Sequence, residues 1–266
     1  MGGVAIAGAR VLLTGATGGL GSVLARRLAN EGAQLSVSGR RAEALHALAA
    51  ELGARAIVAD LAEREDVSAL AAAAADTDVL IACAALPGSG RLQTLDAIHV
   101  DRALEVNLRA PVALAHALLP GMLERRRGAL VFIGSLAGTA PTAGASTYCA
   151  SKFGLRGFAL ALRAELAGSG VGVSHVRPGF IREEGMYART EIVLPRGIGS
   201  RTPHQVTDAV IRAIVHDRAE ITVAPRVLGV GASLATLAPD LAAWASRHSG
   251  GERLSLEFEE RQADQR

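Results

Sequence analysis

The residues of this sequence best suited to chemistry are Tyr148 and Lys152, which stand four positions apart in a segment of helical pattern. Side chains at this spacing share one face of a helix, so the phenol and the ammonium can reach the same site. A free tyrosine has a pKa of about 10 and exchanges protons poorly near neutrality. A neighbouring cation lowers that pKa, so the pair is predicted to pass a proton to or from a substrate.

Composition makes this pair more informative than its spacing alone. The chain has 28 basic residues, but Lys152 is its only lysine, and Tyr148 is one of 2 tyrosines. Lysine offers a compact ammonium, whereas arginine offers a wide and permanently charged group. The single lysine therefore indicates a task that arginine would not perform, with a surface ion pair as the alternative.

The elements that must position this pair are apolar strands alternating with helical patterns. The strands are predicted over residues 11–14, 34–38, 55–59, 78–83, 129–134, 171–176 and 220–223. The helices are predicted over residues 20–32, 41–52, 64–75, 103–127 with a bend near Pro111, 148–166, and from Thr202-Pro203 onward. Such alternation predicts an α/β fold, a Rossmann-like doubly wound parallel sheet of about seven strands with helices on both faces.

Length, charge and cysteine use narrow the class of protein. The 266 residues predict one domain over residues 1–248 and a polar tail over 249–266. The net charge is only +2 and the arginines are scattered, so no nucleic-acid partner is expected. The apolar stretch 227–238 is shorter than the about 20 residues that span a bilayer. Cys83 and Cys149 form no C-x-x-C unit and the histidines have no metal-ligand spacing, so a cytoplasmic protein without a metal site is expected.

A glycine-rich turn follows the first predicted strand and opens the first helix. Glycines at such a turn let the backbone approach a pyrophosphate, and the N–H groups of the helix point at the anion. A tight turn without a ligand is the alternative. The residues expected to contact the cofactor here are Gly15, Thr17, Gly18, Gly19, Leu20 and Gly21.

The end of the second strand predicts which dinucleotide binds. An acidic residue there would accept hydrogen bonds from the ribose of NAD(H), but the segment reads Ser36-Val37-Ser38-Gly39-Arg40-Arg41. A guanidinium suits a phosphate, so NADP(H) is predicted over NAD(H), with Arg40 the first contact and Arg41 the second. The alternative is that both arginines simply begin the next helix in solvent.

From about residue 10 to 225, these motifs resemble the short-chain dehydrogenase/reductase family. Gly15, Gly19 and Gly21 match its T-G-x-x-x-G-x-G turn, although Gly18 also permits the T-G-x-x-G-x-x-G turn of the longer epimerase-like branch. The modest length favours the short branch. The resemblance implies an NADP(H)-dependent enzyme that interconverts a small-molecule carbonyl and an alcohol by hydride transfer, and a homodimer or homotetramer.

The resemblance also implies residue roles. Tyr148 would be the general acid or base, Lys152 would lower its pKa and hold the nicotinamide ribose, and Ser135 would hold the substrate oxygen. Asn107 would support a water in a proton relay. The further cofactor contacts that it implies are Asp60, Leu61, Ala84, Pro178, Gly179 and Ile181. Structural alternatives are a helix cap for Asp60, a turn cap for Ser135 and a buried hydrogen-bonding role for Asn107.

Two departures from the family pattern stand out. Ala82-Cys83-Ala84-Ala85 replaces the family's N-N-A-G, which removes the asparagines that brace that region. Arg182-Glu183-Glu184 replaces a threonine, and is interpreted as solvated residues of a lid over 183–200 that selects the substrate. The apolar segment 227–245 could line a pocket or cover an interface, but packing on the sheet is the default. Rival functions are an NADP-binding sensor without catalysis and an epimerase or dehydratase.

Overall fold

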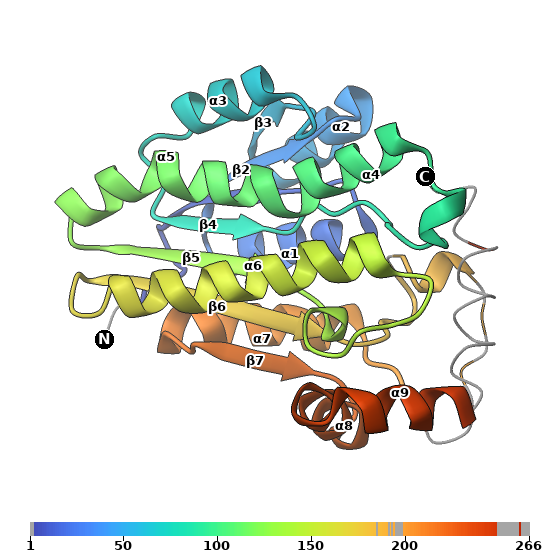
Figure 1. Ribbon diagram of the computed structural model, residues 1–266. Helices are drawn as coiled ribbons and strands as arrows, with labels where there is room; N and C mark the ends of the chain where they lie inside the picture. Colours follow the sequence, from blue (N-terminus) through green and yellow to red (C-terminus); the bar gives the residue numbers. More distant parts are fainter. Residues whose placement is uncertain are drawn as a thin grey trace.

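The computed structural model describes residues 3–184, 186–190, 192, 194, 199–248 and 261. Seven strands, all parallel, form one sheet in the order β3-β2-β1-β4-β5-β6-β7 (Figure 1). The order reverses between β1 and β4, and ligands of doubly wound sheets bind at the carboxyl ends of the strands beside such a reversal. The predicted Rossmann-like α/β fold is confirmed.

The strands agree with the sequence expectation within two residues at each end. They are β1 (Arg10–Thr14), β2 (Gln34–Gly39), β3 (Arg55–Val58), β4 (Val79–Ala82), β5 (Gly128–Ile133), β6 (Val171–Pro178) and β7 (Glu220–Val223). The α-helices are α1 (Gly19–Asn30), α2 (Ala42–Leu52), α3 (Arg64–Ala73), α4 (Ala97–Leu104), α5 (Ala110–Glu124), α6 (Ser146–Glu165), α7 (Pro203–His216), α8 (Arg226–Leu237) and α9 (Pro239–His248).

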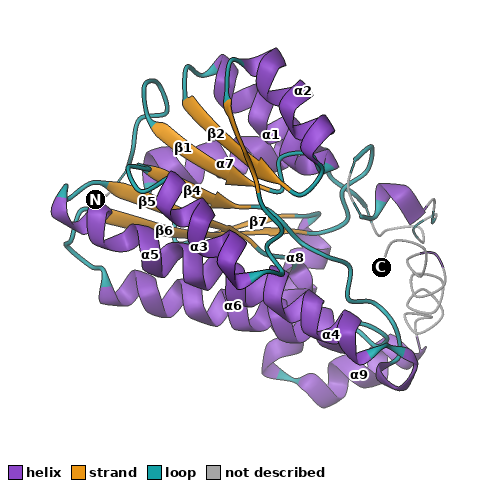
Figure 2. Ribbon diagram, turned by 90° about the horizontal axis from the view of Figure 1, so that it is seen from above, coloured by secondary structure: helices purple, strands orange, loops and turns teal. Residues whose placement is uncertain are grey.

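Helices cover both faces of the sheet, as Figure 2 shows from above. Successive side chains of a strand point to opposite faces, so Val11 and Leu13 join the apolar core under α1, α2 and α7, while Leu12 joins the core under α3, α5 and α6. The central strands β4 and β5 are buried along their whole length. Their continuous apolar runs are therefore what a sheet covered on both sides requires.

The helix predicted over 103–127 differs from the structure at its start. Helical structure begins at Ala97, and a π-helical segment, Glu105–Arg109, joins α4 to α5. The irregularity expected near Pro111 is this π-helical segment, which ends just before that proline in the first turn of α5. Within Ala97–Glu124, a window of 18 residues has a mean hydropathy of 1.2 and would be long enough to cross a membrane, but this stretch packs on α3 and α6.

The segment after β7 does more than the default expectation stated. Its helix α8 lies close to β7, where a Cβ on Gly229 would come within 3.2 Å of the Thr222 side chain, but it also borders a cavity. Several of its apolar residues face solvent, with Val230 60% and Leu237 82% exposed. The predicted polar tail 249–266 lies outside the described residues except for Arg261.

Candidate active site

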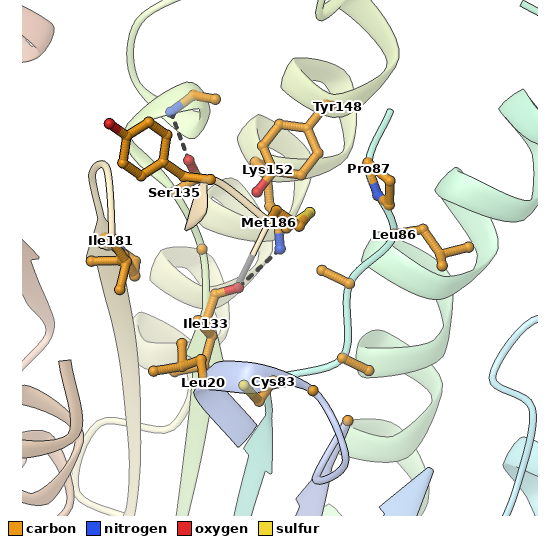
Figure 3. Close-up of a pocket in the computed structure, with 18 of the residues that line it drawn as sticks. Leu20, Cys83, Leu86, Pro87, Ile133, Ser135, Tyr148, Lys152, Ile181 and Met186 are labelled. Carbon is orange, nitrogen blue, oxygen red and sulfur yellow. Dashed lines mark hydrogen bonds between the residues drawn. The ribbon is translucent and has the colours of Figure 1, made fainter. Parts of the chain in front are cut away.

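A cavity of about 930 Å³ opens at the carboxyl ends of β1, β4, β5 and β6 (Figure 3). It brings together residues that are far apart in the sequence. The predicted residues that line it are Gly15, Thr17, Gly18, Gly19, Leu20, Gly21, Arg40, Arg41, Asp60, Leu61, Ala84, Ser135, Tyr148, Lys152, Pro178, Gly179 and Ile181. Asn107 lies behind this lining, buried beside it.

The turn between β1 and α1 has the form of a dinucleotide cradle. Gly15 has a φ of +69°, and a Cβ there would lie 2.6 Å from the Ala84 Cα. A Cβ on Gly21 would lie 2.1 Å from the Gly15 carbonyl oxygen, so neither position admits a side chain. Gly18 precedes α1 without a side-chain cap, and no acidic residue occupies the first turn of the helix. The open N–H groups of that turn fit a pyrophosphate.

The end of β2 places two guanidinium groups at the far end of the cavity. Arg41 donates a hydrogen bond to the Thr17 carbonyl and is thereby tied to the glycine turn. Arg40 is exposed, and its charge helps to lower the pKa of Asp60. Burial raises the pKa of Asp60, but hydrogen bonds from Ala62 and Arg102 overcome that effect. Both oxygens of this carboxylate are thus engaged by protein groups.

Replacing Arg40 with alanine tests the interpretation of this end of the cavity. A charge-assisted hydrogen bond contributes about 1.5–3 kcal/mol, so the Kd for NADPH should rise on the order of 10- to 100-fold. The Kd for NADH should change little, because NADH lacks the 2′-phosphate. Isothermal titration with both cofactors measures the two effects, with Arg41→Ala as the comparison. An equal loss for NADPH and NADH would contradict the assignment.

The phenol of Tyr148, the amine of Lys152 and the hydroxyl of Ser135 meet at the centre of the cavity. Figure 3 shows the first two on the same side of α6, facing the end of β5. Lys152 is 1% exposed, its Nζ lies 5.6 Å from the centre of the Tyr148 ring, and it donates to the Ile133 carbonyl at 3.0 Å. The shared helix face inferred from the spacing is therefore present.

Ser135 combines a structural contact with a place in the cavity. Its Oγ accepts a hydrogen bond from the Ala137 N–H at 3.1 Å and so caps the short 3₁₀ helix Leu136–Gly138. The turn-cap alternative is thus present in the structure. A hydroxyl can still donate its own proton and use a second lone pair, so the cap leaves Ser135 able to bind a substrate oxygen.

Asn107 lies in the π-helical segment and braces the loop after β4. Its Oδ1 accepts from the Leu86 N–H at 2.7 Å, and its Nδ2 donates to the Leu86 carbonyl at 2.9 Å. Thr14 braces the start of the same loop, because its Oγ1 accepts from Cys83 and Ala84 at 3.2 and 3.3 Å. These contacts hold the loop that lacks the N-N-A-G asparagines. Thr14, a polar residue ending an apolar strand, is absent from the predicted set.

Comparison with known proteins decides the family. The model of the short chain dehydrogenase family matches residues 9–191, which is more than half of the chain. The chain belongs to the short-chain dehydrogenase family. It is therefore an oxidoreductase. The matched residues include the glycine turn, Tyr148 and Lys152. The match favours the short branch over the epimerase-like one.

Several known short-chain dehydrogenases are similar to this chain. Ketoacyl reductase HetN of Nostoc sp. is 38% identical over 227 residues, which is 82% of this chain and 79% of that protein. The NADP-dependent 3-hydroxy acid dehydrogenase YdfG of Escherichia coli is 35% identical over 64% of this chain and 72% of its own length. A Sphingobium yanoikuyae short-chain dehydrogenase solved with NADPH has a TM-score of 0.76 at 29% identity, covering 88% of this chain and 95% of that one.

The pKa of Tyr148 in this short-chain dehydrogenase differs from the expectation. Lys152 was expected to lower it, but burial raises the pKa of Tyr148 to about 12, against the lowering effect of the Ser135 hydroxyl. Burial also lowers the pKa of Lys152 to about 8. The physical reason is shared: the cavity wall withdraws both groups from water and disfavours their charged forms. The phenol accordingly keeps its proton at neutral pH.

A buried polar cluster, absent from the predicted set, lies behind Ser135 in this short-chain dehydrogenase. The carboxylate of Glu220 on β7 lies 2.7 Å from Arg156 Nε, 3.1 Å from His175 Nδ1 and 3.3 Å from Arg177 Nη2. Arg177 also donates to the Thr139 hydroxyl at 2.8 Å. The cluster therefore links the outer strands of the sheet to α6 and to the segment that carries Ser135.

The predicted lid is described only in part. Ile181 is buried and pairs with Arg201 in an isolated parallel bridge, while Glu183 and Glu184 are exposed. Glu183 forms an ion pair with Arg182 at 3.0 Å. Gly185, Glu191, Val193 and 195–198 lie outside the described residues.

Proposed function

We propose that the chain is an NADP(H)-dependent reductase or dehydrogenase that interconverts a carbonyl compound and an alcohol, with Tyr148 as the general acid or base. The observation that carries the proposal is the meeting of Tyr148, Lys152 and Ser135 in the same cavity as an uncapped glycine turn, in which Gly15 and Gly21 admit no side chain. The similar NADPH-bound structure and the NADP-dependent relative support the choice of cofactor.

The lining residues divide between holding the cofactor and moving a proton. The glycine turn would hold the pyrophosphate, Arg40 the 2′-phosphate, and Lys152 the nicotinamide ribose. NADP(H), when bound, supplies or accepts the hydride. The hydroxyls of Ser135 and Tyr148 would hold the substrate oxygen and stabilise the charge that develops on it. In reduction Tyr148 donates its proton to that oxygen, a role for which its protonated state at neutral pH suits it.

The proposal also covers the role of Asn107, the cellular setting and the oligomeric state. Asn107 would position the loop after β4 and, through a water, complete the proton relay. Cys83 and Cys149 are unpaired, which favours a reducing, cytoplasmic setting. A homodimer or homotetramer is proposed, and light scattering coupled to gel filtration would measure the assembly.

A thermal-shift comparison of NADPH with NADH, followed by a panel of ketones and aldehydes, tests the proposed function. NADPH should raise the Tm more than NADH does, and at least one carbonyl compound should oxidise NADPH in the presence of the protein. Stabilisation by NADPH without turnover of any carbonyl or alcohol would favour the alternative of an NADP-binding sensor. Absence of a shift with either cofactor would remove the assignment.

The pKa of Lys152 predicts the pH dependence of carbonyl reduction. Lys152 is protonated below about pH 8 and loses its charge above it, whereas Tyr148, with a pKa of about 12, stays protonated throughout. The kcat/KM for reduction should therefore be flat on the acid side of pH 8 and fall as the pH rises through it. A profile flat to pH 10 in the unchanged protein would contradict the prediction.

A further inference from the structure

The cavity extends from the catalytic residues to an apolar wall. Thr236 of α8 donates a hydrogen bond to the Thr139 carbonyl at 3.0 Å, so α8 lies against the segment that follows Ser135. The wall is formed by the segment before α6 and by α8. The residues that line it there are Ala140, Pro141, Ala143, Leu228, Gly231 and Ala235. Those of α8 recur at three- and four-residue intervals, which places them on one face of the helix.

Two aromatic residues, Phe180 just before the lid and Tyr187 within it, add to this apolar surface. The rings of Phe180 and Tyr187 lie 5.3 Å apart and are tilted against each other. The Tyr187 hydroxyl donates to the Ile192 carbonyl at 2.8 Å. Tyr187 therefore uses its hydroxyl within the lid segment, and what it adds to the cavity is mainly the surface of its ring.

The charged residues of the described lining lie elsewhere in the cavity. Arg40, Arg41 and Asp60 are at the ribose end, and Lys152 is bound to the Ile133 carbonyl. Glu184, an anion of the lining, is exposed and interacts electrostatically with Arg26 of α1. Among the described residues, the wall formed by α8 and the segment before α6 thus holds no cation. A carboxylate buried against it would lose its hydration without gaining a partner.

We infer that the substrate is an uncharged carbonyl compound with a bulky apolar body, and that Gly231 keeps open the space this body occupies. The inference rests on the proposed function, since it names the substrate class of the same site. The inferred substrate class differs from that of relatives such as the 3-hydroxy acid dehydrogenase of Escherichia coli, whose named substrates are acids.

Gly231 is suited to a test because it can be changed without strain. A Cβ added there meets nothing within 4 Å, and its backbone has no left-handed φ. Leucine also favours a helix more than glycine does, so Gly231→Leu should fold at least as well as the unchanged chain. The neighbouring Val230 is 60% exposed and does not line the cavity, so Val230→Leu is a matched control on the other side of α8.

The experiment measures kcat/KM with NADPH for four compounds: acetoacetate, benzoylacetate and the ethyl ester of each. Each ester should exceed its free acid by at least about 10-fold, since a bound substrate that covers this apolar wall would remove water from a carboxylate without giving it a partner. Gly231→Leu should lower the ratio of benzoylacetate ester to acetoacetate ester on the order of 10- to 100-fold. Val230→Leu should leave that ratio unchanged.

The outcomes separate this inference from the proposed function. Faster reduction of the free acids, or an unchanged ester ratio in Gly231→Leu, would overturn the inference and leave the reductase assignment standing. Failure to reduce either ester would also overturn it. If NADPH in addition failed to raise the Tm, the proposed function would fall as well.

Discussion

Tyr148→Phe should lower the kcat of NADPH-dependent carbonyl reduction by roughly 1,000-fold, within the range that a general acid contributes. The variant keeps the ring that packs beside Lys152 and removes only the hydroxyl that would donate the proton. The Tm rise on adding NADPH should persist, because the glycine turn and the guanidinium groups are untouched. Steady-state kinetics at pH 7 and a thermal-shift titration measure the two quantities.

The other tyrosine of the chain provides the matched control. Tyr187→Phe makes the same chemical change in the same cavity, but the hydroxyl it removes is donated to the Ile192 carbonyl. We expect a loss of less than about 10-fold, in line with one neutral hydrogen bond. Equal losses in the two variants would contradict the assignment of Tyr148 as the proton donor.

Glu220→Gln should lower the free energy of unfolding by about 3 kcal/mol at pH 7. The carboxylate balances two arginines in a largely buried setting, and removing one partner of such a cluster leaves charge without compensation. Urea unfolding followed by circular dichroism measures the change. Glu51→Gln is the control: Glu51 pairs with Arg26 at 2.7 Å on the open surface, where ion pairs contribute little.

The same carboxylate predicts how stability depends on pH. Burial raises the pKa of Glu220, but hydrogen bonds from His175 and Arg156 overcome this and lower it to about 2 from an ordinary 4.5. A lowered folded-state pKa stabilises the fold above the unfolded value, and that stability is lost as the pH falls from about 4.5 to about 2. The acid-induced loss should be smaller in Glu220→Gln. Parallel curves for the two proteins would refute this.

The parallel sheet and the shared helix face of Tyr148 and Lys152 were predictable because each depends on local spacing. Alternating apolar strands and helices predict a parallel sheet, and Tyr148 and Lys152 share a helix face at any register of the surrounding fold. The glycines were predictable for a similar reason. A position such as Gly21, where a Cβ would meet backbone at 2.1 Å, leaves glycine as the sole workable residue.

The other features of the fold and the site could not be predicted, because they depend on contacts between segments that are far apart in the sequence. The cluster around Glu220 joins β6, β7 and α6, and no spacing within one segment predicts that meeting. The pKa of Tyr148 was expected to fall because a cation was near, but depth in the cavity decides its direction. The role of α8 stayed open between lining a pocket, covering an interface and packing on the sheet, because an apolar helix has the same sequence pattern in all three places.

The burial of Lys152 has a consequence for chemical labelling. Since this is the only lysine in the chain and is 1% exposed, an amine-selective acylating reagent has no accessible side-chain target while the fold is intact. Incorporation of such a label at Lys152, read by mass spectrometry, would therefore count openings of this one cavity. A dinucleotide bound over the amine would slow the labelling further. The labelling rate of Lys152 would then report how much of the protein has bound cofactor, without an added dye.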